Sequence, residues 1–164
     1  MKMPTLPLLL CALVLLNGVA ESHGWRVHCP SGWNLLYGRC FKYVSTRVTW
    51  IQAERSCMFM GGNLASVRSY AEYRAIQGLI QRYSHWSGLT WIGGSDAVQE
   101  RSWLWSDGTR MTYSNWCPGR NNYSRSFNCL RMNYTSRKCW DDHTCTDRHP
   151  FVCVLKRTWY HCRG

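Results

Sequence analysis

The residues with the clearest chemistry in this sequence are its cysteines. The chain has 164 residues and ten cysteines, one of which, Cys11, lies in an apolar N-terminal run. Clustered cysteines can hold zinc, but no two of these have the spacing of a zinc ribbon. In an oxidising compartment, nine cysteines form four disulfides and leave one thiol over. The nine are Cys29, Cys40, Cys57, Cys117, Cys129, Cys139, Cys145, Cys153 and Cys162.

Residues 1–20 have the layout of a secretory signal peptide, which explains the oxidising compartment. Lys2 supplies a basic start, residues 6–16 are almost all apolar, and small residues at 18–20 suit cleavage. The run is too short to cross a bilayer, and no later stretch is apolar enough to do so. We therefore expect a secreted, extracellular protein without a membrane span.

The histidines give little support for catalysis. They are scattered along the chain, and the sequence has neither a Gly-x-Ser-x-Gly nor a His-Glu-x-x-His motif. His143 lies near Asp141 and Asp142, which could suggest a metal site, but a histidine on a solvated turn is the simpler interpretation. We expect a binding protein rather than an enzyme.

The charge of the chain is strongly basic and unevenly distributed. The formal net charge is +11, and +10 without Lys2. From Arg110 onward, ten basic residues face three acidic ones. Such an arginine-rich field favours polyanions such as sulfated or sialylated glycans, bacterial surface polymers or anionic lipid. A merely solvated basic surface is the alternative, and nucleic acid is not expected as a partner of a secreted protein.

Two helices are expected to support these residues. Thr49 opens an amphipathic run with a capping box completed by Gln52, and the run ends at Gly61-Gly62. Ser69 opens a second run, with Glu72 three residues later and apolar residues on one face. Short strands are expected before, between and after the helices, at residues 39–44, 64–67, 90–92, 102–105 and 151–155.

The segment from about 109 to 138 lacks regular periodicity and predicts long loops. It is rich in Asn, Ser, Arg, Gly and Tyr. A loop of that length in a compact domain is normally functional or pinned, and four cysteines lie in or beside it. We expect an α+β fold: two helices packed on small antiparallel sheets, with a long loop region pinned by disulfides.

At more than a dozen ordered positions the sequence resembles the C-type lectin-like domain family. The resemblance covers residues 29–155, after a short N-terminal segment at 21–28 and before a tail at 156–164. It rests on Cys29-Pro-Ser-Gly-Trp33, Gly38-Arg-Cys40-Phe41, Thr49-Trp50 through Cys57, Gly62-Asn-Leu-Ala-Ser66, Trp91-Ile-Gly-Gly94, Trp103 through Gly108, Cys129, Cys145 and Cys153.

The resemblance implies how the cysteines pair. The family's bridges correspond to Cys29–Cys40, Cys57–Cys153 and Cys129–Cys145. Cys117 and Cys139 then remain as an extra pair inside the loop region. Together with residues 138–142, this pair is most similar to the type II antifreeze proteins and ladderlectin-like lectins of fish.

The resemblance also implies where a ligand would bind. Sugar-binding members of the family hold calcium on the long loop through a Glu-Pro-Asn or Gln-Pro-Asp triplet, a nearby Glu and a Trp-Asn-Asp triplet. The matching positions here are Arg120-Asn121-Asn122, Phe127 and Trp140-Asp141-Asp142. Arginine and phenylalanine cannot ligate calcium, so only Asn122, Asp141 and Asp142 remain as candidate ligands, and calcium needs about six to eight oxygens.

We therefore expect no cofactor and no standard calcium site, although calcium stays possible. Our preferred interpretation is that Arg120 replaces the ion and pairs with Asp141 or Asp142. Arg120, Asn121, Asn122, Asp141 and Asp142 are the candidate ligand-binding residues. Asn122 and Asn133 are candidate glycosylation acceptors, because each begins an Asn-x-Ser/Thr sequence.

The expected function is recognition of carbohydrate, anionic glycans or microbial surfaces by a soluble lectin-like protein. The expected contacts come from two loop tyrosines and four loop arginines, namely Tyr123, Tyr134, Arg120, Arg125, Arg131 and Arg137. Ice binding is the alternative that the resemblance suggests, and blocking of a receptor is a third possibility. Cys162 has no intradomain partner, so a disulfide-linked homodimer is its simplest fate.

Overall fold

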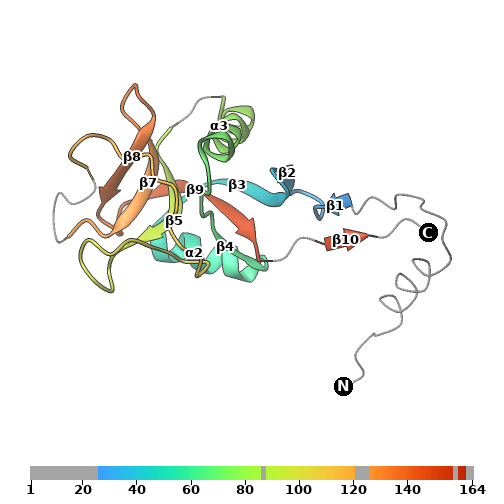
Figure 1. Ribbon diagram of the computed structural model, residues 1–164, viewed down its shortest axis with the longest axis horizontal. Coiled ribbons are helices and arrows are strands. Elements are labelled where there is room, and N and C mark those ends of the chain that lie inside the picture. The colour runs from blue at the N-terminus through green and yellow to red at the C-terminus, as the bar shows by residue number, and fades with distance from the viewer. Residues whose placement is uncertain (1–25, 86–87, 121–125, 157–158, 162–164) are drawn as a thin grey trace, which may run out of the picture.

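The computed structural model describes residues 26–85, 88–120, 126–156 and 159–161. Among these residues, two helices pack against a curved mixed sheet. In the view of Figure 1, α3 lies above the strands and α2 below them, while β7 and β8 form one end of the molecule. The helices and the sheet thus support a hairpin at that end.

Helix α2 spans Trp50–Phe59, as the sequence predicts. The capping box is complete, since the Gln52 N–H donates to Thr49 Oγ1 and the Thr49 N–H donates to Gln52 Oε1, at 3.4 and 3.1 Å. Gly61 follows the helix with a φ of 86°, a left-handed conformation that glycine adopts without strain.

Helix α3 spans Tyr70–Ser84 and begins at the predicted cap. The Glu72 N–H donates to Ser69 Oγ at 3.1 Å. The buried Glu72 side chain also accepts from Arg39 Nη1 at 3.0 Å, an ion pair that ties the helix to strand β3. The buried face of α3 carries Tyr73, Ile76, Leu79 and Ile80.

The main sheet has eight strands among the described residues. Its order is β2-β3-β9-β5-β7-β8, with β4 paired to β9 and β6 paired to β5. The bounds are β2 Asn34–Leu36, β3 Arg39–Val48, β4 Gly62–Leu64, β5 Thr90–Ser95, β6 Leu104–Trp105, β7 Cys129–Tyr134, β8 Cys139–His143 and β9 His149–Leu155.

This sheet differs from the small antiparallel sheets that we expected. Strand β9 lies between β3 and β5, antiparallel to the first and parallel to the second. Strand β9, the last strand of this sheet in the sequence, therefore lies at its centre and joins β2 and β3 to β5, β7 and β8 in one mixed sheet. The overall α+β class with two helices is confirmed.

The loop region contains a strand that we did not expect. We expected loops from about 109 to 138, but β7 occupies 129–134 and all of its residues except Tyr134 are buried. From Leu130 to Asn133 apolar and polar side chains alternate, which is a strand pattern, although the polar Arg131 and Asn133 are buried as well. The strand expected at 64–67 lies slightly earlier, at Gly62–Leu64.

A separate two-stranded sheet pairs the segments on either side of the predicted domain. β1 (Arg26–His28) runs antiparallel to β10 (Trp159–His161), at the end opposite to β7 and β8 (Figure 1). Cys162 and the expected signal peptide lie outside the described residues. In the part of the chain that is described, no helix is long and apolar enough to span a membrane.

Four disulfides hold the fold together, and they are the pairs that the resemblance implies. The bridges among the described residues are Cys29–Cys40, Cys57–Cys153, Cys117–Cys139 and Cys129–Cys145. The two cysteines of each bridge are 11, 96, 22 and 16 positions apart in the sequence, respectively. Cys57–Cys153 joins α2 to β9 inside the core, where both residues are fully buried.

Trp140 lies at the centre of the part of the core beneath the loop region. Its side chain is fully buried and meets four other aromatic rings edge-on, with centroid distances of 5.6 to 6.1 Å. These rings belong to Tyr73, Trp105, Tyr113 and Trp116. The aromatic cluster therefore anchors β8 to α3 and to the loop that precedes β7.

Candidate functional site

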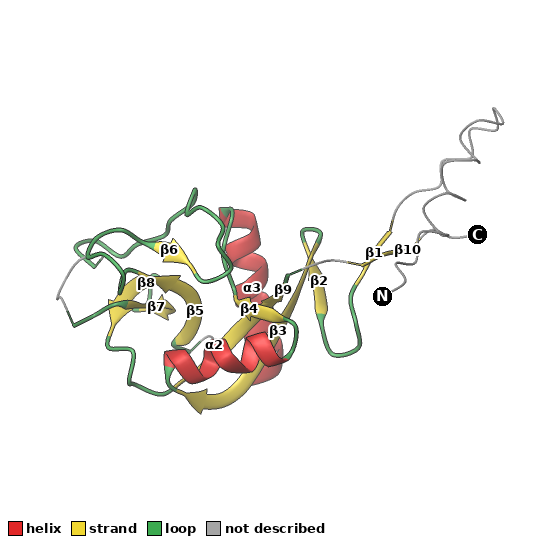
Figure 2. Cartoon of the chain, turned by 90° about the horizontal axis from the view of Figure 1, so that it is seen from below, coloured by secondary structure: helices red, strands yellow, loops and turns green. Residues whose placement is uncertain are grey.

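The candidate site lies where residues 115–120 run alongside the β7–β8 hairpin, at the end of the molecule opposite to β1 and β10 (Figure 2). The Trp140 N–H donates to the Asn115 carbonyl, and the Cys117 N–H donates to the Trp140 carbonyl, both at 2.8 Å. The Asp142 N–H donates to the Arg120 carbonyl at 3.2 Å, and the Cys117–Cys139 disulfide adds a covalent link. Residues 115–120 are therefore held along β8, and Arg120 is placed beside the hairpin.

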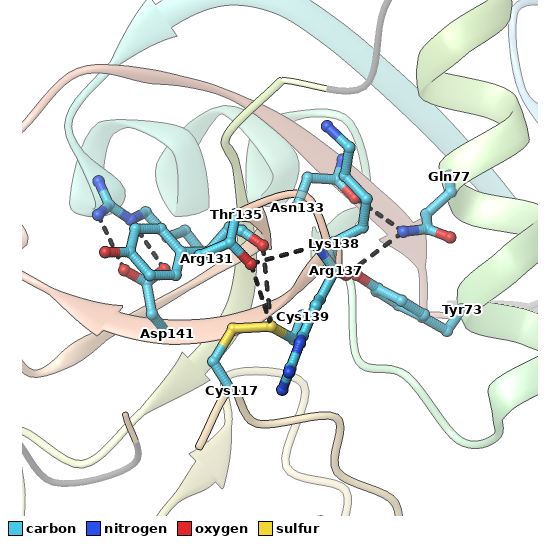
Figure 3. The surroundings of a disulfide bond; sticks show 11 residues. Tyr73, Gln77, Cys117, Arg131, Asn133, Thr135, Arg137, Lys138, Cys139 and Asp141 are labelled. Carbon is cyan, nitrogen blue, oxygen red and sulfur yellow. Dashed lines mark hydrogen bonds and ion pairs between the residues drawn. A yellow bond between two sulfur atoms is a disulfide. The ribbon is translucent and has the colours of Figure 1, made fainter. Parts of the chain in front are cut away.

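A buried ion pair crosses the hairpin from β7 to β8. Arg131 Nε and Nη2 donate to the two carboxylate oxygens of Asp141 at 2.9 and 2.8 Å (Figure 3). The two side chains are 9% and 2% exposed. This fork-to-fork geometry satisfies both oxygens of Asp141 and neutralises its charge inside the protein.

The ion pair corrects two of our expectations. The arginine that pairs with Asp141 is Arg131, its neighbour across the strands, and not Arg120, whereas the expected alternative, a pair between Arg120 and Asp142, stays a prediction. Arg131 was expected to contact ligand at the surface, but it is buried. A long side chain in the middle of a hairpin can turn inward when a carboxylate lies opposite it on the neighbouring strand. The sequence alone does not show which residues lie opposite each other.

The other candidate ligand residues have different positions. Asp142 is 2% exposed, so neither carboxylate of the Trp140-Asp141-Asp142 triplet belongs to the accessible surface. Arg120 is half-buried. Asn121, Asn122, Tyr123 and Arg125 lie outside the described residues.

These positions do not fit the calcium site that the family resemblance implies. Asp141, one of three remaining candidate ligands, has both oxygens engaged by Arg131. Phe127 stands at the position of another ligand and packs against the ring of His143 at 5.3 Å. A cation at this place would have to displace a guanidinium, which disfavours binding.

Calcium is therefore expected to leave the thermal stability of the protein unchanged. A ligand present at a hundred times its dissociation constant would stabilise the fold by about 2.7 kcal/mol, enough to raise the melting temperature by several degrees. Melting curves in millimolar calcium, in magnesium at equal ionic strength and in chelator should coincide. An increase of several degrees that only calcium causes and chelator reverses would contradict this.

Asn133, a candidate glycosylation acceptor, is buried and hydrogen-bonded inside the protein. Its side chain amide donates to the Gly88 carbonyl at 3.1 Å and accepts from Gln77 Nε2 at 3.0 Å, and the residue is 4% exposed. A glycan on the amide nitrogen has no room in this arrangement. Burial and hydrogen bonding of its amide therefore disfavour Asn133 as a glycan acceptor.

We expect Asn133 to be unmodified in folded protein secreted from eukaryotic cells. The physical reason is that attachment would break a hydrogen bond between buried groups and place a sugar in the core. Mass spectrometry of the peptide that contains Asn133 tests this, with Asn122→Gln protein as the control for modification of the other acceptor. A glycan on Asn133 in monomeric, folded protein would show the expectation to be wrong.

Three side chains, from the end of β8, the following loop and the start of β9, form the group that most resembles a metal site among the described residues. Ligand atoms of His143, Asp147 and His149 lie within 4.8 Å of one another. However, His149 Nε2 lies 3.2 Å from Arg131 Nη1, which can only donate. Burial, followed by the charge of Arg131, lowers the pKa of His149 to about 4, so this ring is neutral at pH 7. The guanidinium disfavours a cation here, and we assign the group a structural role.

A depression beside the Cys117–Cys139 disulfide brings together residues from two segments. Its volume is about 360 Å³. We call it the basic pocket, and it is lined by Cys117, Pro118, Arg120, Tyr134, Thr135, Ser136, Arg137 and Cys139. Of the predicted contact residues, it unites Arg120, Tyr134 and Arg137. The pocket also contains Pro118, Thr135 and Ser136, which were not among the predicted contact residues. The Cys117–Cys139 pairing that the resemblance implies is the signal that brings their two segments together.

Comparison with known proteins identifies the family of this fold. The family model described as the lectin C-type domain matches residues 46–155. This range lies within the predicted domain, residues 29–155, whose outer bounds remain a prediction.

Relatives match over nearly the whole chain. A type-2 ice-structuring protein of Hemitripterus americanus is 36% identical over 93% of this chain and 99% of its own. Ladderlectin of Oncorhynchus mykiss is 38% identical over 92% of both chains. The crystal structure of a calcium-independent type II antifreeze protein is 37% identical, covers 82% of this chain and 98% of its own, and superposes with a TM-score of 0.74. The chain therefore belongs to the C-type lectin domain family.

Proposed function

We propose that this protein is a secreted lectin-like recognition protein that binds carbohydrate, with a preference for anionic glycans on cell or microbial surfaces. It acts by binding and not by catalysis. Membership of the C-type lectin family and the similarity to ladderlectin support a lectin-like role. The predicted signal peptide and the four disulfides support secretion, since disulfides persist in oxidising compartments.

The observation that supports the proposal most is the kind of charge at the candidate site. Its carboxylates are buried, whereas basic groups line its accessible surface. Asp141 is neutralised in the interior by Arg131, whereas Arg120 and Arg137 line the basic pocket. Loss of available carboxylates argues against a cation-bridged sugar. The arginines instead favour an oxyanion, which guanidinium groups bind with directed hydrogen bonds.

Ice binding is the second candidate function, because the similarity to the two ice-binding relatives favours it. Ice-binding faces tend to be flat and weakly charged. The segment from Arg110 onward is instead crowded with arginine. We therefore rank ice binding below glycan binding. Measurement of thermal hysteresis on the protein used for a glycan array would separate the two functions.

The proposed function predicts salt-sensitive retention on immobilised heparin. The net charge of +11, or +10 without Lys2, attracts a polyanion at low salt. Screening shortens the reach of exposed charges from about 10 Å at 0.1 M to about 3 Å at 1 M salt, so binding should weaken steeply over this range. Elution from heparin and from an uncharged matrix of the same type checks this. Passage through the heparin column at low salt would argue against the proposal.

A further inference from the structure

A depression of about 590 Å³ lies between β2 and α3, and we call it the β2–α3 groove. One wall consists of residues 33–36, and the other of Ala75, Gly78, Leu79 and Arg82. The spacing of the helix residues places them on one face of α3. Residues 33–36 are consecutive, and successive residues of a strand point to opposite faces, so the groove follows the edge of the strand rather than a face. The groove thus lies between a strand edge and a helix face.

The edge of β2 along this groove has no strand partner among the described residues. β2 is the outermost strand of the main sheet and pairs only with β3. Between these strands, Tyr37 and Gly38 have φ values of 47° and 76°, as in the type I′ turn of a two-residue hairpin. In such a hairpin the flanking residues, Leu36 and Arg39, exchange hydrogen bonds, so the N–H and C=O of Leu35 point away from β3. The edge therefore offers a backbone donor and a backbone acceptor to an added strand.

Gly78 keeps the groove open on the helix side. It lies inside α3, where glycine is less favourable than alanine. A Cβ added at this position would meet no atom within 4 Å, so packing inside the protein does not require glycine here. A larger side chain would instead project into the groove that Gly78 lines. The absent side chain leaves room for a side chain of an added strand.

The walls of the groove favour an apolar side chain next to an acidic one. Trp33 and Leu36 are half-buried and Leu79 is buried, so they offer apolar surface. Arg82 is exposed and is the only charged residue among the described residues that line the groove. Glu72, the only acidic residue of α3, is engaged in its ion pair with β3. The groove therefore complements a negative charge.

We infer that the β2–α3 groove binds an extended segment of another protein, which adds as a strand to the edge of β2. Hydrogen bonds to the Leu35 backbone hold the segment, an apolar side chain fills the space beside Gly78, and an acidic side chain pairs with Arg82. In Figure 1, β2 lies on the side of α3 that faces β1 and β10, away from the β7–β8 hairpin. A partner bound there leaves the candidate site accessible, so this interaction goes beyond the proposed function.

The probe is a phage-displayed library of short random peptides, selected on the full secreted protein. Enriched peptides are synthesised, and their dissociation constants are measured by fluorescence polarisation for the wild type, Gly78→Leu, Arg82→Gln and Arg55→Gln. Gly78→Leu fills the groove from the helix side. Arg55→Gln is the matched charge control, because Arg55 is exposed on α2. Gly78→Ala, which adds only a Cβ, is the folding control and should raise the melting temperature by about 1–4 °C.

We expect the enriched peptides to share an apolar and an acidic residue. Gly78→Leu should weaken their binding at least tenfold without lowering the melting temperature, because leucine is a good helix former. Arg82→Gln should weaken binding about two- to fivefold, as is typical of an exposed ion pair, and should have no effect on a peptide whose acidic residue is replaced by its amide. Arg55→Gln should stay within about twofold.

Backbone methylation of the peptide tests the addition as a strand. N-methyl groups are introduced one residue at a time. Binding should weaken about tenfold at the residue whose N–H donates to the Leu35 carbonyl, and much less at its two neighbours, whose N–H groups point away from β2. Equal effects at all positions would reject strand addition.

Two further results would overturn the inference. If no peptide is enriched, or if the enriched peptides bind Gly78→Leu as tightly as the wild type, the groove does not bind an extended segment. A second copy of the chain is the other possible occupant, and sedimentation velocity of Cys162→Ser protein with and without Gly78→Leu tests it. Self-association that Gly78→Leu abolishes would assign the groove to a second copy instead. Neither result affects the proposed glycan binding, which the glycan array tests separately.

Discussion

Replacement of both Cys57 and Cys153 by alanine is expected to lower the free energy of unfolding by about 4–5 kcal/mol. The bridge closes a chain of 96 residues of separation, so its loss returns a large conformational entropy to the unfolded chain. Both residues are fully buried where α2 meets β9, so the substitution also leaves small voids in the core. Urea unfolding followed by tryptophan fluorescence measures the loss.

The matched control is removal of the Cys29–Cys40 bridge. It closes only 11 residues of separation, and the same chain-entropy argument gives about 3 kcal/mol. The difference between the two variants should thus be about 2 kcal/mol. If removal of the short bridge costs as much as removal of the long one, chain entropy does not determine the effect.

The second large effect concerns the buried Arg131–Asp141 pair. Asp141→Leu or Arg131→Met alone is expected to cost about 3–5 kcal/mol, because each leaves one buried charge without its partner. The double variant Arg131→Met/Asp141→Leu should recover most of that loss, because replacement of both charges by apolar groups is often neutral. The four unfolding free energies form a double-mutant cycle, and the coupling energy is its readout.

Arg55→Met is the control for the loss of a positive charge. Arg55 is exposed on α2, so its substitution should change the unfolding free energy by no more than about 0.5 kcal/mol. Single variants of the ion pair that cost as little as this control would mean that the pair is not held in a low-dielectric interior. A double variant that is less stable than both single variants would contradict the explanation that the loss in each single variant comes from an unpaired buried charge.

The ion pair also engages one of the candidate calcium ligands that the family resemblance implies. A carboxylate that could otherwise face a cation accepts from Arg131 with both oxygens. The calcium experiment and the double-mutant cycle therefore both test how the Asp141 carboxylate is engaged. If calcium does not bind and the cycle shows strong coupling, the former ligand position has become part of the core.

Local signals predicted the helices well. Thr49 and Ser69 are the N-caps of α2 and α3, and the apolar spacing of α3 selects the face that is buried. Caps and amphipathic spacing act within a few residues of sequence, so the sequence alone is sufficient to locate them. The cysteine spacing and the glycine-containing motifs likewise indicate the family.

Polar residues that become buried were the main source of error. Arg131 and Asn133 alternate with the apolar Leu130 and Met132 in β7 but are buried like them, in a segment that we expected to be loop. Their partners are Asp141 on β8, Gln77 on α3 and the carbonyl of Gly88. Because these partners lie between 10 and 56 residues away in the sequence, no local pattern reports that the polar groups are satisfied.

The sequence by itself determined the family, the helices and the presence of a disulfide-pinned, arginine-rich loop region. These follow from residue types and short spacings, which act independently of the rest of the fold. Only the tertiary structure decided which arginine is buried against Asp141 and which arginines line the basic pocket. That choice depends on the register of β7 against β8, where Arg131 faces Asp141, and on the loop that brings Arg120 to Tyr134. Whether a side chain is buried in the core or lines the surface depends on which residues lie opposite it in the folded protein.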